Sequence, residues 1–281
     1  MRVGIMLTGG PHGNPIRNGE QEMLHGASDI HYERRGSGPP LLLVHGLGGD
    51  RWVWAPVLDR LAARRDVVAV DLPGFGSSPA LNSGRTPTPA ALAGSLAALV
   101  DALGLERVDV AGNSLGGWVA LELARLGRAR TVTAIAPAGF WSRPLGPRPG
   151  LKVRRLPHPV RAVLPFVAAA GPVRRAALTG VVAHPERVPA EAARRIVRSY
   201  LDAPGFDAVN DAMRAGFIPP GSLRDLGIPV TIAWARHDRL VGPPRGGVPG
   251  ATEVVLEDSG HLAMWDEPDA VAALVLGVSG G

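Results

Sequence analysis

A serine between glycines is the first place where this sequence could do chemistry. Gly112-Asn113-Ser114-Leu115-Gly116 fits the pattern G-x-S-x-G, and it lies where an apolar run meets an amphipathic stretch. In a strained turn from strand to helix the backbone segments come close together, so side chains beside the serine would clash. The pattern predicts a nucleophile held above a sheet edge, near the positive end of a helix. The alternative is that Ser114 only caps that helix.

A serine hydroxyl is a weak nucleophile and needs a base, for which His261 is the best-placed histidine. It lies in "DSGHLAMWDEP", between the last predicted strand and the last predicted helix. Asp238 directly follows a predicted strand and would orient the imidazole of His261. His237 is a poorer base because its side chain points away from that of its neighbour in an extended chain. The order Ser114, Asp238, His261 is the order expected when the serine sits on such a turn.

Other carboxylates fit this chemistry less well. Asp225, Asp258 and Asp266 are alternative acids. Asp258 would require an unusual loop path, and Asp266 with Glu267 is better interpreted as capping the final helix. Asp71, in "VDLPGFGSSP", is predicted to order its own loop through Asx-type hydrogen bonds.

Acyl transfer also needs donors for the oxyanion. The segment "HGLGGD" follows an apolar run, and the backbone N–H of Leu47 could supply one donor. Leu115, directly after the serine, would supply the other. His45 is predicted to support the loop that presents Leu47 rather than to react.

The composition excludes several kinds of chemistry. The chain has no cysteine, so disulfides, thiolate metal sites and cysteine nucleophiles are excluded. The histidines and carboxylates show no metal-ligand spacing, and no cofactor is expected. No stretch is apolar enough to span a membrane, and no signal peptide is apparent, so we expect a soluble cytoplasmic protein. No feature of the sequence indicates an oligomeric state.

The positive charge is concentrated in one segment. The formal net charge is +5, and residues 141–200 contain eleven Arg and one Lys against Glu186 and Glu191. Aromatic platforms and a nucleic-acid-binding module are absent there, so no nucleic-acid partner is expected. A solvated basic surface is the favoured interpretation, and a pocket rim that attracts anionic substrates is the alternative.

Apolar runs of strand length alternate with helical patterns, which predicts a parallel sheet with right-handed crossovers. The alternation breaks at residues 139–222, where helical patterns and prolines dominate. We therefore expect an α/β core at 28–138 and 223–281, a helical insertion at 139–222, and a flexible extension at 1–27 in which Met23 is a second candidate start. The predicted strands are 30–36, 41–46, 66–76, 107–112, 130–137, 228–235 and 252–257.

Five motifs together, "LLLVHGLGGD", "DLPGFGSSP", "AGNSLGGWVAL", "ARHDRLV" and "DSGHLAMWDEP", resemble the α/β-hydrolase superfamily in its lidded branch. The resemblance implies an eight-stranded, mostly parallel α/β sheet flanked by helices, with a helical cap inserted after strand 6, where 139–222 falls. It maps Ser114, Asp238 and His261 as nucleophile, acid and base, and Leu47 with Leu115 as the oxyanion hole. A serine nucleophile argues against epoxide hydrolases and haloalkane dehalogenases, whose nucleophile is aspartate.

The leading hypothesis is a serine hydrolase of a small or medium carboxylic ester, a carboxylesterase in which an anionic substrate group would suit the basic insertion. Alternatives with the same triad are a carbon–carbon bond hydrolase of dienoate-type diketones and a cofactor-free haloperoxidase. A non-catalytic receptor with a hydrolase fold is less favoured. The residues expected to line the substrate pocket are Gly46, Asn113, Phe140, Trp141, Met213, Phe217 and Leu262.

One segment departs from the family pattern. Between Asp238 and Thr252 such proteins usually have a helix, but here "RLVGPPRGGVPGA" contains three prolines and four glycines. A regular helix does not tolerate that composition. We expect a loop, and a more loosely held Asp238.

Overall fold

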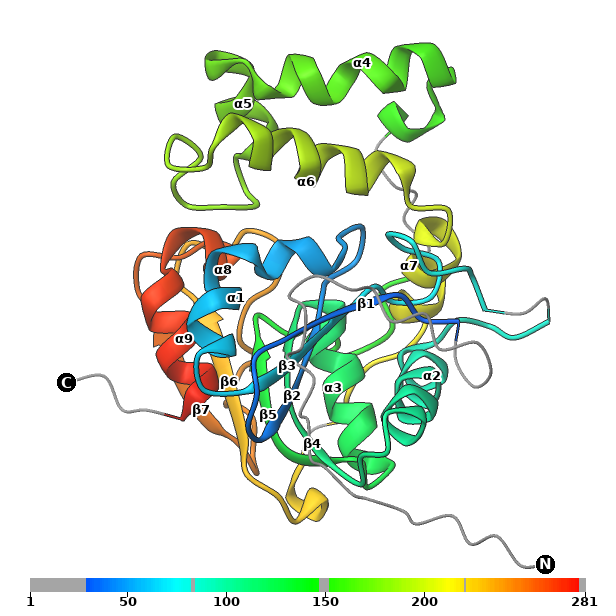
Figure 1. The fold of residues 1–281 in the computed structure, drawn as a ribbon, viewed down its shortest axis with the longest axis vertical. Coiled ribbons are helices and arrows are strands. Elements are labelled where there is room, and N and C mark those ends of the chain that lie inside the picture. The colour runs from blue at the N-terminus through cyan, green and yellow to red at the C-terminus, as the bar shows by residue number, and fades with distance from the viewer. Residues whose placement is uncertain (1–28, 82–83, 147–151, 220, 278–281) are drawn as a thin grey trace, which may run out of the picture.

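A single twisted sheet organises the protein (Figure 1). The computed structural model describes residues 29–81, 84–146, 152–219 and 221–277, so the predicted extension at 1–27 lies outside the described residues. The strand order is β1-β3-β2-β4-β5-β6-β7; β1 is antiparallel to β3, and every other pair is parallel. The strands are β1 (Tyr32–Arg35), β2 (Pro40–Val44), β3 (Asp66–Val70), β4 (Val108–Asn113), β5 (Ala129–Ile135), β6 (Val230–Ala235) and β7 (Thr252–Leu256).

The strand count corrects one expectation. Within the described residues the sheet has seven strands rather than eight, and the helical insertion follows the fifth of them rather than a sixth. Each of the seven corresponds to a strand predicted from the sequence, whereas the eighth came from the resemblance alone. No further strand joins this sheet in the described part of the chain.

Helices cover both faces of the sheet. Alternate residues of a strand point to opposite faces, so Leu42 and Val44 join the core under α2 and α3, while Leu41 and Leu43 join the core under α1 and α9. Figure 1 shows α2 and α3 on one side and α1, α8 and α9 on the other. The bounds are α1 (Ala55–Ala62), α2 (Pro89–Ala102), α3 (Leu115–Arg125), α8 (Ala263–Asp266) and α9 (Pro268–Leu276).

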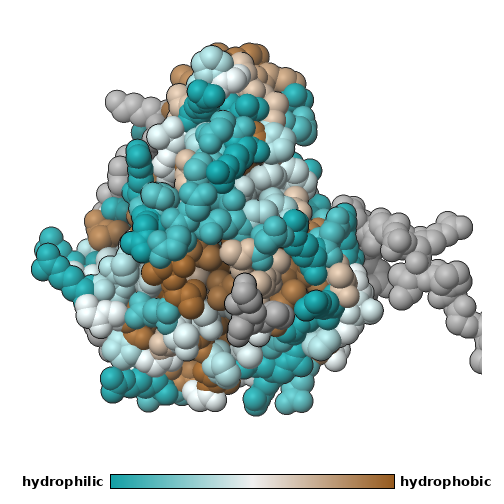
Figure 2. Space-filling model, turned by 90° about the vertical axis from the view of Figure 1, so that its left-hand side faces the viewer, coloured by the Kyte–Doolittle hydropathy of each residue, from teal (hydrophilic) through white to brown (hydrophobic). Residues whose placement is uncertain are grey.

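Four α-helices lie between β5 and β6 in the described residues. They are α4 (His158–Ala169), α5 (Gly171–Leu178), α6 (Ala190–Asp202) and α7 (Phe206–Arg214). The outer layer, α4 to α6, lies above the core in Figure 1, while α7 lies against it. The space-filling view shows this layer as an upper lobe, with hydrophobic side chains at its top and along its junction with the core (Figure 2).

Two further sequence expectations concern helices. Between β6 and β7 the described chain forms turns and loop without a helix, as the prolines and glycines there predict. In the part of the chain that the structure covers, no helix has the length and apolar character that crossing a bilayer demands.

Candidate active site

Ser114 occupies a strained turn between β4 and α3. Its φ is 56° and its ψ is −118°, a conformation that side chains rarely adopt, and its side chain makes no capping hydrogen bond to α3. A Cβ on Gly112 would lie 2.1 Å from the Gly116 carbonyl oxygen, and one on Gly116 would lie 2.2 Å from that of Val44. The turn can form only because Gly112 and Gly116 have no side chain. These contacts contradict the capping interpretation and leave the hydroxyl available for chemistry.

His261 and Asp238 form a hydrogen-bonded pair. Nδ1 of His261 lies 2.7 Å from Oδ2 of Asp238, whose side chain is 1% exposed. A carboxylate only accepts, so Nδ1 is the donor and Nε2 remains an acceptor. The other oxygen, Oδ1, accepts from the backbone N–H of Leu240 (2.7 Å) and Val241 (3.0 Å). The expectation of a loosely held Asp238 is wrong, because the short loop after β6 turns its own N–H groups onto the carboxylate.

The alternative residues do not join this pair. The side chain of Asp258 bonds to His184, and Asp225 lies in a 3-10 turn ahead of β6. His237 is exposed, and its backbone N–H donates to the carbonyl oxygen of Ser259.

Asn113 ties β4 to the loop that carries His261. Its Nδ2 donates to the carbonyl oxygens of His261 (2.9 Å) and Ile135 (3.2 Å), and the residue is fully buried. From the sequence, Asn113 was predicted only to line the substrate pocket. Its role in holding the His261 backbone depends on a contact across 148 residues, which no local pattern reveals.

Two backbone N–H groups lie free beside the serine. Within the described residues, neither Leu47 nor Leu115 donates its N–H to another group. Gly46 lets the first loop approach closely, because a Cβ there would lie 3.1 Å from Cβ of Ser114. His45 supports this loop as expected: Nδ1 bonds to the Gly46 carbonyl oxygen at 2.7 Å, and Nε2 accepts from the N–H of Leu72 at 2.9 Å. Burial lowers the pKa of His45, which keeps its imidazole neutral.

Asp71 has the structural role predicted for it. The buried carboxylate accepts from the backbone N–H groups of Arg51 and Ser77, both at 2.8 Å, and pairs with the Arg51 guanidinium. It therefore orders both its own loop and the start of the segment after β2.

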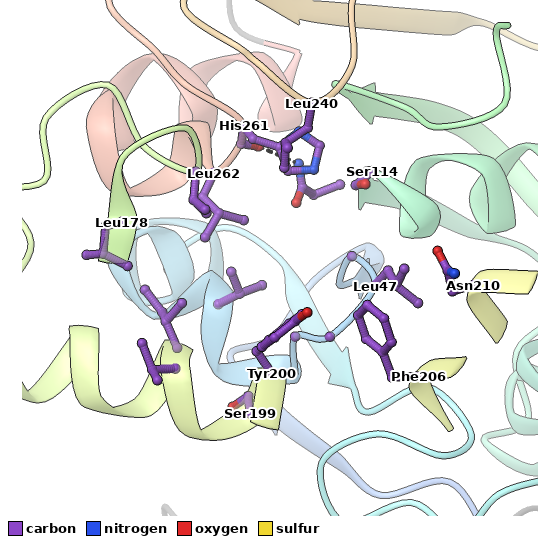
Figure 3. Close-up of a pocket in the computed structure, with 18 of the residues that line it drawn as sticks. Leu47, Ser114, Leu178, Ser199, Tyr200, Phe206, Asn210, Leu240, His261 and Leu262 are labelled. Atoms are coloured by element: carbon purple, nitrogen blue, oxygen red, sulfur yellow. Dashed lines mark hydrogen bonds between the residues drawn. The ribbon is translucent and has the colours of Figure 1, made fainter. Parts of the chain in front are cut away.

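A cavity of about 880 Å³ opens in front of Ser114 and His261 (Figure 3). Of the residues expected in its wall, one lies elsewhere: Phe217 is 38% exposed and is not among the lining residues of the described chain. Phe217 lies three residues beyond the end of α7, outside the helix that contributes Met213. The expected residues that do line the cavity are Gly46, Asn113, Phe140, Trp141, Met213 and Leu262.

The far part of the cavity was not expected from the sequence. In Figure 3 the space runs from Ser114 past Leu262 to Leu178, and its walls there are almost entirely apolar. Trp52 also lines it, stacks against Trp265 with ring centroids 5.2 Å apart, and lies under the guanidinium of Arg195. The insertion contributes Leu164, Val167, Ala168, Val173, Ala177, Leu178, Val181, Ile196, Val197 and Tyr200 to this region.

Two polar contacts attach the insertion to the loops of the site. Oγ of Ser199, on α6, lies 2.6 Å from Oδ2 of Asp50, four residues after Gly46. The carboxylate of Asp266 accepts from the N–H groups of Ala183, His184 and Gly260 at 2.8–2.9 Å. The prediction that Asp266 caps the final helix is therefore wrong, since the carboxylate joins the insertion to the loop of His261.

His184 and Asp258 form another such contact, with 2.6 Å between Nε2 and Oδ1. The hydrogen bond to Asp258 raises the pKa of His184, and the same bond lowers the pKa of Asp258. Within the described residues, no three His, Asp or Glu side chains gather as a metal ion would require.

The chain belongs to the alpha/beta hydrolase family, whose sequence pattern matches residues 41–274. It is similar to the dihydrolipoyllysine-residue acetyltransferase component of the acetoin cleaving system of Cupriavidus necator, with 31% identity over 90% of this chain and 67% of that protein. It is also similar to the epoxide hydrolase EphH of Mycobacterium tuberculosis, with 30% identity over 66% of this chain and 92% of that protein. Among solved structures, an alpha/beta hydrolase fold protein from Nakamurella multipartita matches with a TM-score of 0.67 and 26% identity, over 88% of this chain and 95% of that one.

Proposed function

We propose that the protein is a serine hydrolase that cleaves carboxylic esters through an acyl-enzyme. The observation that carries the proposal is the uncapped Ser114 on its strained turn, in one cavity with a His261 whose Nδ1 is bound by Asp238. A base oriented by a carboxylate is what an unactivated hydroxyl needs to become a nucleophile.

In the proposed mechanism, Oγ of Ser114 attacks the ester carbonyl while Nε2 of His261 takes its proton. The N–H groups of Leu47 and Leu115 stabilise the oxyanion, and His261 then gives the proton to the leaving alcohol. Water activated by His261 releases the acid. Asp238 keeps the proton of His261 on Nδ1 throughout and stabilises the imidazolium.

The relatives' names bear on the choice of reaction. One is named an acetyltransferase component and the other an epoxide hydrolase. Acyl transfer agrees with a serine at position 114, whereas the epoxide hydrolases of this superfamily use an aspartate nucleophile. This favours ester cleavage over epoxide opening.

We further propose that residues 139–222 act as a cap over a core formed by 28–138 and 223–281. A cavity of about 880 Å³ lies in the upper part of the range of roughly 300–1,000 Å³ for small-molecule sites. Its walls are mainly apolar and come from both parts. The proposed substrate is therefore an ester with a large apolar group, rather than the small or medium ester inferred from the sequence.

Labelling with a fluorophosphonate and assay of Ser114→Ala test the mechanism. We expect the label on Ser114, and in the variant a fall in kcat of about 10⁶-fold, because removal of the nucleophile removes the whole triad mechanism. Ser95→Ala, on α2, is the control and should be labelled and active like the parent.

More than about 1% residual esterase activity in Ser114→Ala would contradict the mechanism. If a dienoate-type diketone were cleaved in preference to nitrophenyl esters of any chain length, the proposed triad would stand. The bond that the enzyme cleaves would then be a carbon–carbon bond rather than an ester.

A further inference from the structure

The outermost helix of the insertion carries an apolar stripe that none of the described residues covers. Val160, Val163 and Val167 are spaced by three and four residues, which places them on one side of α4. Leu156 lies in the bend just before the helix. All four are exposed, Val163 at 56%. The opposite side of α4 packs on α6, where Arg161 donates to the carbonyl oxygen of Leu201. In Figure 1, α4 forms the top of the molecule, away from the core.

The same region is strongly basic. Residues 152–178 contain five Arg and one Lys and no Asp or Glu. Arg154 and Arg161 bond to backbone carbonyl oxygens of the insertion. The ion pairs of the described insertion involve other residues, so Arg155, Arg174 and Arg175 keep their charge without a carboxylate partner there.

The cavity reaches the surface at this stripe. Val167 on α4 and Val173 on α5 both line the cavity, and both are more than 40% exposed. Hydrophobic side chains are also visible at the top of the upper lobe in Figure 2. The apolar stripe of α4 and the wall of the cavity therefore share Val167.

We propose that the outer face of α4 and α5 docks on an anionic lipid bilayer. A helix with an apolar face and arginines beside it lies in the plane of the interface, with its apolar side chains below the headgroups. Unpaired arginines near the surface are attracted by anionic headgroups and bond well to phosphate oxygens. This docking goes beyond the proposed ester cleavage and does not depend on it.

The charge argues against a second copy of the chain as the occupant. In a symmetric dimer the same patch meets itself, which would bring Arg155, Arg174 and Arg175 of each copy close to those of the other. Like charges facing one another destabilise such a contact. An anionic bilayer neutralises the same charges and accepts the apolar stripe as well.

Vesicle flotation with the full chain tests the proposal. The vesicles contain phosphatidylcholine alone, or with about one quarter phosphatidylglycerol to supply the anionic surface. We expect at least about tenfold more binding to the anionic vesicles at about 0.05 M salt, and a large reduction at about 0.5 M salt, where surface charges are screened.

Variants separate the two components of the contact. Val160→Ser with Val163→Ser should reduce binding to anionic vesicles at least about tenfold, because both side chains leave the apolar phase. Arg174→Gln with Arg175→Gln should remove most of the preference for anionic lipid. The control is Leu126→Ser with Val255→Ser, two similarly exposed apolar residues directly after α3 and on β7, which should bind like the parent.

Equal binding to both kinds of vesicle, or to neither, would overturn the proposal. So would the same loss in the control pair. Self-association by analytical ultracentrifugation that the valine variants abolish, without lipid binding, would assign the stripe to a second copy. Unchanged circular dichroism and melting temperature in each variant show that loss of binding is not loss of fold.

Discussion

The two oxygens of the Asp238 carboxylate have different partners, and this difference makes its chemistry testable. Oδ2 accepts from His261, while Oδ1 accepts from two backbone N–H groups of the loop after β6. An asparagine side chain has only one oxygen, so it could not accept hydrogen bonds both from His261 and from the loop. Its oxygen would face the two N–H donors, so its NH₂ would face His261.

We therefore expect Asp238→Asn to reduce kcat by about 10⁴-fold, because the amide places the proton of His261 on Nε2, the wrong nitrogen for a base. The melting temperature should change little, since the variant keeps the shape and the loop hydrogen bonds. Steady-state kinetics and thermal unfolding measure both. Asp225→Asn, at an alternative acid of the sequence, is the matched control, and an equal loss there would argue against the assignment.

At the residue scale, chemistry made the candidate site predictable. Few residues can act as nucleophile, base and acid, and Ser114, Asp238 and His261 stand at strand ends in an order that limits the choice. Asp266 was misinterpreted because its partners, Ala183 and His184, lie more than 80 residues away in the chain. A local pattern contains no information on such contacts.

At the scale of elements, apolar runs located the inner strands β2 to β6, because parallel strands covered on both faces are largely apolar. The two edge strands, β1 and β7, were also expected from the sequence, although they are partly polar. The missing helix after β6 was equally predictable, since proline and glycine act locally. The path of residues 152–214 was not predictable, because the helices α4 to α6 pack mainly on one another and line the cavity.

Asp266 offers a test of how α8 holds two loops together. We expect Asp266→Ala to lower the free energy of unfolding by about 3 kcal/mol, because one buried and two partly buried N–H groups lose a charged acceptor. Urea denaturation measures this. Asp269→Ala, in the first turn of α9, removes only an exposed ion pair with Arg60 and should cost less than about 1 kcal/mol. Similar losses in the two variants would mean that the Asp266 contacts contribute little.

At the scale of the whole molecule, the contact of His184 with Asp258 makes the attachment of the insertion depend on pH. The folded state raises the pKa of His184, so its contribution is complete below the ordinary value of about 6.5 and is lost as pH rises through the raised value. The pKa of Asp258 is lowered, so the stability that its carboxylate contributes is lost only in acid, as pH falls through that lowered value.

As pH rises above about 6.5, stability should therefore decline more steeply in the parent than in His184→Gln, which has no imidazole to titrate at this contact. Urea denaturation at several pH values gives the slopes, and NMR titration of the imidazole gives its pKa directly. Parallel slopes, or a His184 pKa at or below about 6.5, would contradict the contact.

The stacked Trp52 and Trp265 give the molecule an optical reporter. Trp52 forms part of the cavity wall, its ring lies under the guanidinium of Arg195, and its neighbour Trp265 follows His261 by four residues. Any molecule that enters the apolar region displaces water from this indole and changes its surroundings. Occupancy of the cavity should thus be readable from intrinsic fluorescence without a chromogenic substrate. The same readout should work in the Ser114→Ala protein, which we expect to bind substrate without turnover.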